Sequence, residues 1–321
     1  MQLLEVEASA PGKVILFGEH AVVYGEPSLS LALQRRTFVS GQPVGEAFTV
    51  NGFPLDPNFH SYIERAVKQH WKLGPLRLQT ESQIPSGSGI GSSAALSVAT
   101  NAVLLRLQSP DTVPLSEIAH AAFLTEFDTQ GRASPNDTTV ATAGGGVLLA
   151  PKRLESPDLE FLWQIEREER TWNAHRVKIP ELPLVIGVTG SKGKTAEQVA
   201  KVRRFVEKSS FARDVVKDIG RITMAGVEAL RKNDLRTLGD LMNRNHEHLH
   251  TLGVDTPLLE TLVQGARKVR GTLGAKLTGA GGGGSMVVLS ENPDEVKVAL
   301  EKLGASAFLA PASRDGVLVK P

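Results

Sequence analysis

The residues best suited to chemistry gather in glycine-rich segments. Ile84 to Ala95 reads Ile-Pro-Ser-Gly-Ser-Gly-Ile-Gly-Ser-Ser-Ala-Ala, so three alternating glycines run into a stretch that favours a helix. Such a loop leaves backbone N–H groups free at the positive end of a helix, where phosphate binds. Ser92 and Ser93 suit the helix cap, and a hydroxyl there can also reach a magnesium ion on the phosphates. A phosphate-binding loop is predicted, with a tight turn and N-cap as the plain alternative.

Two other nucleotide-loop patterns fail on spacing. A dinucleotide fingerprint starting at Gly87 needs its third glycine where the chain has Ser92. The segment from Gly187 to Thr195 ends in Gly-Lys-Thr, as a P-loop does. Its first glycine should lie five residues before Gly193, where the chain has Val188. Neither a Rossmann site nor a P-loop is expected.

A possible zinc motif lies further along the chain. His246-Glu247-His248-Leu249-His250 matches His-Glu-x-x-His, which places two imidazoles on one face of a helix. The motif falls inside an amphipathic pattern between Leu241 and Leu252, which favours a packing helix. A zinc metallopeptidase using His246, Glu247 and His250 is retained as the alternative from a different class.

Two further segments combine glycine with polar residues or with strands. Pro11–Gly25 places Lys13, Glu19 and His20 beside an apolar strand, so they line a cleft or form a turn with exposed charges. Lys276–Ser285 joins two expected strands and contains four consecutive glycines, which are costly to order. A flexible hairpin is the plain alternative, but packing against the phosphate loop would explain why this loop has almost no side chains.

The elements that must position these residues alternate between strands and helices. The boundary between two domains is expected near residue 178, after a charged stretch in which periodicity fades, giving domains 1–177 and 178–321. Strands are expected at Leu4–Ala8, Leu76–Thr80, Leu182–Val188, Ala275–Thr278 and Ser285–Leu289. Helices are expected at Phe59–Trp71, Ser92–Leu107, Leu115–Phe127, Thr195–Val206, Asp214–Leu230, Leu235–Leu249, Thr256–Arg270 and from Asn292 to about Leu303.

Composition narrows the class of protein. The 36 Lys and Arg residues and 35 Asp and Glu residues give a formal net charge of +1. The chain therefore has no overall positive potential that would attract nucleic acid or acidic lipid. The absence of cysteine excludes disulfides, thiolate zinc sites and thiol nucleophiles. Neither a secretion signal nor a membrane span is expected from the acidic first seven residues and the lack of a long apolar run. We expect a cytoplasmic protein that binds small molecules.

Taken together, Pro11–Gly25, Pro85–Ala95 and Lys276–Ser285 resemble, in order and spacing, three signature segments of one kinase family. That family of small-molecule kinases includes galactokinase, homoserine kinase, mevalonate kinase and phosphomevalonate kinase. The first segment is most similar to that of the mevalonate kinases. The resemblance to these kinases extends over nearly the whole chain. The resemblance implies an α/β and α+β two-domain fold, with a ribosomal-S5-domain-2-like N-terminal domain, a ferredoxin-like C-terminal domain and the active site in the cleft between them.

The resemblance also implies an activity: ATP-dependent phosphorylation of (R)-mevalonate to 5-phosphomevalonate, with ATP and Mg²⁺ and a homodimeric state. Asp137 is the implied catalytic carboxylate and Lys13 its neighbour. Magnesium ligands would be Ser93 and Glu126, the latter eleven residues upstream of Asp137. The implied substrate contacts are Glu19, His20 and Thr189. The implied nucleotide-binding residues are Pro85, Gly87, Ser88, Gly89, Ile90, Gly91, Ser92, Ser93, Gly279, Ala280 and Gly281.

The stretch around Asp137 departs from the family pattern. Arg132-Ala133 and Pro135-Asn136 replace the more usual Asn-Pro and Gly-Ile/Val. The catalytic carboxylate is retained, so the change bears on which alcohol is bound. A phosphomevalonate kinase or another small-alcohol kinase therefore stays open, as does a nucleotide-sensing binding module without catalysis.

Overall fold

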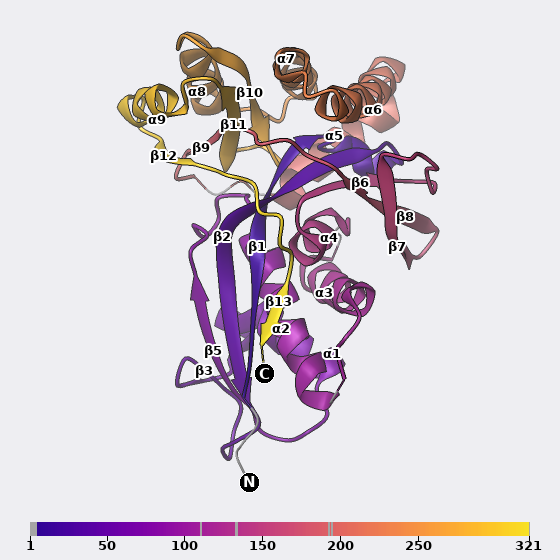
Figure 1. The fold of residues 1–321 in the computed structure, drawn as a ribbon, viewed down its shortest axis with the longest axis vertical. Helices are drawn as coiled ribbons and strands as arrows, with labels where there is room; N and C mark the ends of the chain where they lie inside the picture. Colours follow the sequence, from indigo (N-terminus) through magenta and orange to yellow (C-terminus); the bar gives the residue numbers. More distant parts are fainter. Residues whose placement is uncertain (1–4, 110, 132–133, 192, 194, 321) are drawn as a thin grey trace.

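The computed structural model describes residues 5–109, 111–131, 134–191, 193 and 195–320, and they form two sheets covered by helices (Figure 1). The larger sheet runs in the order β4-β3-β5-β2-β6-β8-β7, with β1 pairing β2 and β13 pairing β1. The smaller sheet has the order β10-β11-β9-β12. The strands of the larger sheet are β1 (Val6–Phe17), β2 (Ser28–Gln42), β3 (Thr49–Val50), β4 (Phe53–Pro54), β5 (Arg77–Ser82), β6 (Gly146–Ala150), β7 (Leu159–Arg167), β8 (Arg170–Val177) and β13 (Leu318–Lys320). Those of the smaller sheet are β9 (Leu184–Val188), β10 (Thr272–Thr278), β11 (Ser285–Ser290) and β12 (Ser306–Leu309).

The helices form two groups along the chain. The first group is α1 (Pro57–His70), α2 (Ser92–Gln108), α3 (Leu115–Gln130) and α4 (Asn136–Ala143), with a 3₁₀ turn, η1 (Ala21–Tyr24), after β1. The second group is α5 (Thr195–Lys208), α6 (Ser210–Arg231), α7 (Leu235–Thr251), α8 (Pro257–Arg267) and α9 (Pro293–Lys302). Figure 1 shows the second group gathered with the smaller sheet at the top of the view. None of the helices in the described residues has the length and apolar character needed to cross a bilayer.

Local sequence signals account for most of these helices. α8 begins where predicted, because the Thr256 hydroxyl accepts from the Leu259 N–H at 3.2 Å and Pro257 occupies the first turn. α2 is buried over most of its length and packs against β1, β2 and the other helices of its group, in keeping with its Ala- and Leu-rich sequence. The expected helices therefore form, with ends shifted by a few residues.

Two elements differ from the expectation. The charged stretch before residue 178, in which no strand was expected, is a β-hairpin, β7–β8. Trp163 and Ile165 are buried, while Gln164 and Glu166 on the other face are exposed. Asp137 lies in the first turn of a short helix, α4, that the sequence did not predict. The boundary at 177/178 stays a prediction: β8 ends at Val177 in the larger sheet and β9 opens the smaller one, but β13 returns to the larger.

The two sheets meet beside the glycine-rich segments. The Ile15 backbone N–H donates to the Thr278 hydroxyl at 3.1 Å, and that hydroxyl is 3.0 Å from the Ile15 carbonyl oxygen. The Ser285 hydroxyl donates to the Ser88 carbonyl at 2.6 Å. The predicted phosphate loop is therefore braced by the loop between β10 and β11, as expected, and that loop is not a flexible hairpin.

Candidate active site

The predicted phosphate loop has the backbone that its glycines suggest. Gly87, Gly89 and Gly91 have φ of 70°, 78° and 85°, in the left-handed region that glycine adopts readily. Within the described part of the chain, the backbone N–H groups from Gly87 to Ser93 have no protein acceptor. They lie at the N-terminus of α2, where the helix dipole adds partial positive charge. This geometry suits an anion.

Lys13 joins this loop to the predicted catalytic carboxylate. Its ammonium Nζ is 3.1 Å from the Gly89 carbonyl oxygen and 3.0 Å from Asp137 Oδ2. The Lys13 side chain is 4% exposed and that of Asp137 33%, so the carboxylate alone remains open to a ligand. The backbone reinforces the contact, because the Lys13 N–H donates to the Ile90 carbonyl at 2.9 Å. One buried cation thus holds the loop and the carboxylate side by side.

Glu126 and Ser93 lie together next to this centre. Burial raises the pKa of Glu126 to about 7, and the negative charge of Asp137 adds to the rise, while a hydrogen bond with Ser93 and the charge of Lys13 act against it. Gln130 Nε2 donates to Glu126 Oε1 at 3.3 Å and to the Tyr62 hydroxyl at 3.2 Å. Sequence reasoning missed Tyr62 and Gln130; the spacing of Gln130, four residues after Glu126 on one helix, was the available signal.

His20 occupies a tight position after β1. Its φ of 60° is unusual for a residue with a side chain, and its Nε2 lies 3.0 Å from the Ala280 carbonyl. Burial lowers the pKa of His20 to about 4, so the imidazole is neutral at pH 7. A carbonyl only accepts, so Nε2 carries the proton and Nδ1 is an acceptor. Nδ1 is buried and has no partner among the described residues.

Glu19, next to His20, is engaged by the smaller sheet and its helices. Its Oε1 forms an ion pair with Lys276, and its Oε2 accepts from Asn245 Nδ2 at 3.0 Å. The Glu19 and Lys276 side chains are buried. Burial lowers the pKa of Lys276, and the charge of Glu19 opposes this. Lys276 and Asn245 were not predicted, because their partner lies more than 220 residues away in the chain.

The remaining predicted residues line the two glycine loops. Gly279 lies against the Gly89 carbonyl, and a Cβ at this position would lie 3.5 Å from that oxygen. The Thr189 hydroxyl donates to the Gly284 carbonyl at 2.9 Å, and the Gly284 N–H donates to the Ser191 carbonyl at 2.9 Å. Thr189 thus belongs to the brace of the second glycine loop. The segment that resembled a P-loop packs on this loop, and its Lys192 and Lys194 lie outside the described residues, as do Arg132 and Ala133.

The zinc motif does not assemble as a metal site. His246 is buried, with Nε2 2.9 Å from Glu260 Oε2 and Nδ1 accepting from the Leu277 N–H at 3.3 Å. Both of its ring nitrogens are therefore occupied by protein groups. His250 is exposed and pairs with Asp255 at 2.8 Å. The helix is a packing helix, as the amphipathic pattern favoured.

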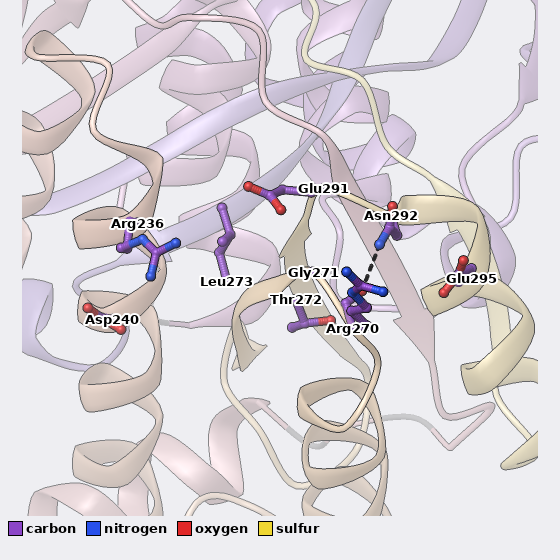
Figure 2. Close-up of a pocket in the computed structure, with 9 residues that line it drawn as sticks. All are labelled: Arg236, Asp240, Arg270, Gly271, Thr272, Leu273, Glu291, Asn292 and Glu295. Atoms are coloured by element: carbon purple, nitrogen blue, oxygen red, sulfur yellow. Dashed lines mark hydrogen bonds between the residues drawn. The ribbon is translucent and has the colours of Figure 1, made fainter.

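A surface hollow lies away from these residues. Figure 2 shows it between α7, the start of β10 and the start of α9. Arg236 and Arg270 lie there with Asp240, Glu291 and Glu295, so the lining of this open surface mixes cations and anions. None of the predicted site residues lines it. The candidate active site is therefore placed by chemistry at Lys13 and Asp137.

Comparison with known proteins places this geometry in a family. Residues 59–145 match the GHMP kinases N terminal domain, and residues 227–308 match GHMP kinases C terminal. The mevalonate kinase of Pyrococcus furiosus is 34% identical, with 99% of each chain covered. That of Methanothermobacter thermautotrophicus is 37% identical over 88% of this chain and 90% of its own. The chain belongs to the mevalonate kinase branch of the GHMP kinase family.

Solved structures agree with this membership. The structure of L. major mevalonate kinase in complex with R-mevalonate has a TM-score of 0.78 and 27% identity, covering 95% of this chain and 94% of its own. The structure of the Methanococcus jannaschii mevalonate kinase has a TM-score of 0.75 and 25% identity, covering 97% of this chain and 98% of its own. The two-domain α/β GHMP kinase fold expected from the sequence is confirmed, and the chain is a kinase that uses ATP as a substrate. The metallopeptidase alternative is not favoured by these matches.

Proposed function

We propose that this GHMP kinase transfers the γ-phosphoryl group of ATP to the primary hydroxyl of (R)-mevalonate, giving 5-phosphomevalonate and ADP. Curated mevalonate kinases at 34–37% identity support the substrate. The observation that carries the proposal is the Lys13 ammonium, which contacts both the phosphate loop at Gly89 and the Asp137 carboxylate. A bound phosphate chain and an incoming alcohol would then share one centre.

Asp137 and Lys13 divide the proposed chemistry. Asp137 accepts the proton of the substrate hydroxyl. The hydroxyl oxygen then bonds to the γ-phosphorus of ATP as the bond between that phosphorus and the leaving oxygen of ADP breaks. Lys13 attracts the negative charge that gathers on the transferring group. The free N–H groups from Gly87 to Ser93 hold the phosphates without reorganising. Positioning and charge stabilisation therefore account for the rate enhancement.

Glu126 and Ser93 fit a magnesium ion. Both offer hard oxygen ligands, and the buried Glu126 carboxylate has hydrogen-bond donors beside it but no ion-pair partner among the described residues. Magnesium, when bound with ATP, neutralises phosphate charge and orients the γ-phosphoryl group. The metal, the homodimer and the cytoplasmic location stay predictions.

His20 is proposed as a substrate contact. Its buried Nδ1 is an acceptor without a partner, and a substrate hydroxyl would satisfy it. Direct substrate contacts by Glu19 and Thr189 stay predictions. Both carboxylate oxygens of Glu19 already have partners, and the Thr189 hydroxyl bonds to Gly284. Glu19 instead supports the segment that presents His20.

ADP release should be measured with mevalonate, phosphomevalonate, homoserine and galactose as acceptors. We expect turnover with mevalonate alone at saturating ATP. Asp137→Asn should lower kcat by roughly 10²–10⁴-fold while ATP affinity stays nearly constant, since a positioned base contributes on that order. Asp240→Asn, at an exposed carboxylate in the surface hollow, is the control and should leave kcat unchanged. Preference for phosphomevalonate, or unchanged kcat in Asp137→Asn, would overturn the proposal.

A further inference from the structure

The structure assigns a positioning role to Asn136: its side-chain amide fixes the orientation of the Asp137 carboxylate. Asn136 Nδ2 lies 3.0 Å from Asp137 Oδ1, while Lys13 Nζ lies 3.0 Å from Oδ2. Each oxygen of the carboxylate therefore has its own donor. A carboxylate offers about four acceptor positions, so room remains for a substrate hydroxyl. The inference rests on the proposed function of Asp137.

The orientation of the Asn136 amide follows from its partners. An ionised carboxylate only accepts, so the nitrogen must face Asp137 and the oxygen must face away. Two hydroxyls of β2 complete the amide. Ser28 Oγ donates to Asn136 Oδ1 at 3.0 Å, and Ser30 Oγ accepts from Nδ2 at 3.0 Å. Ser28 and Ser30 are two residues apart and so lie on one face of the strand.

Burial makes this arrangement rigid. Asn136 is 2% exposed, Ser28 1% and Ser30 0%, so water does not compete for the hydrogen bonds between the Asn136 amide and the two serines. β2 pairs with both β1, which carries Lys13, and β6, which follows α4. The same sheet thus anchors the donor on each side of the carboxylate. Asn136, held by β2, fixes the position of Asp137 Oδ1. Lys13, on β1, fixes the position of Oδ2.

Asn136→Leu tests the role, because leucine has nearly the same size but no donor. We expect kcat for mevalonate to fall roughly 10- to 100-fold, with KM for mevalonate and ATP affinity changed less than about threefold, since small displacements of a catalytic group act on turnover. The control is Asn173→Leu, at a buried asparagine whose Nδ2 bonds to the Pro151 carbonyl. It should lower stability and leave kcat of the folded enzyme unchanged.

A double-mutant cycle separates positioning from folding. In the Asp137→Asn background, Asn136→Leu should have no further effect on the residual turnover, because the carboxylate that it orients is gone. Additive losses, or a kcat in Asn136→Leu equal to that of the wild type, would overturn the inference. If Asp137→Asn itself keeps full turnover, the assignment of Asp137 fails, and that outcome is distinct from a failure at Asn136 alone.

Discussion

At the scale of single residues, the candidate site holds one carboxyl group in surroundings that disfavour its charged form. Glu126 is buried and near Asp137, so its pKa rises to about 7. The folded protein therefore holds a proton on Glu126 that the unfolded chain, with a pKa near 4.5, releases. The contribution to folding stability is present at low pH and is lost as pH rises toward 7. A metal ion that neutralised Glu126 would offset this cost.

Glu126→Gln should remove this pH dependence. With magnesium and nucleotide absent, the unfolding free energy of the wild type should fall by about 2 kcal/mol relative to the variant between pH 5.5 and pH 8, since the full span from 4.5 to about 7 corresponds to about 3 kcal/mol. Urea denaturation at the two pH values measures this. Glu181→Gln, at an exposed carboxylate, is the control. Parallel pH curves for wild type and Glu126→Gln would contradict the prediction.

The site residues that could be predicted from the sequence are those whose conformation depends on their neighbours in the chain. The alternating glycines before α2 predict the phosphate loop, because both the backbone conformation and the helix start depend on neighbours in the chain. Asp137 and Glu126 came from a family resemblance. The role of Asn136 could not be predicted, because its partners Ser28 and Ser30 are more than 100 residues away. Only folding reveals which strand face meets that amide.

At the scale of elements, the packing of strand β1 on the start of helix α2 sets the site. Gly91 precedes α2 with φ of 85°, and a Cβ there would lie 2.7 Å from Lys13 Cγ. The lack of a side chain lets the loop approach Lys13. The hairpin β7–β8 shows where element prediction failed: surface charges concealed a period-2 pattern whose buried face carries Trp163 and Ile165. Packing, not composition, decided that element.

Gly91→Ala should therefore damage both stability and turnover. Any alanine at this φ is strained by roughly 1–2 kcal/mol, and the contact with Lys13 adds to that. Gly25→Ala provides a matched control, with φ of 86° and no atom within 4 Å of the added Cβ. We expect the Gly91 variant to unfold at lower urea than the Gly25 variant and to lose at least about tenfold in kcat. Equal unfolding midpoints would show that the Lys13 contact is unimportant.

At the scale of the whole molecule, the C-terminal segment ties the two sheets together. After β12 the chain leaves the smaller sheet, and Figure 1 shows it running down beside β1 to end as β13. On the way, the Val317 N–H donates to the Thr142 carbonyl at 3.1 Å, and Arg36 Nη2 donates to the Gly316 carbonyl at 2.6 Å. Thr142 lies near the end of α4, the helix that begins with Asn136 and Asp137. The segment thus supports α4, which carries the proposed catalytic residue Asp137, from its far end.

Gly316→Ala tests whether this support matters to the whole molecule. A Cβ at Gly316 would lie 2.0 Å from the Thr142 carbonyl oxygen, so the segment and α4 must separate. Because backbone atoms on both sides resist movement, the unfolding free energy should fall by about 2–3 kcal/mol, and kcat should fall with it as Asp137 shifts. Arg314→Ala, at an exposed residue of the same segment, should change neither quantity. A Gly316→Ala protein with lower stability but full kcat would show that the segment holds the two sheets together without positioning α4.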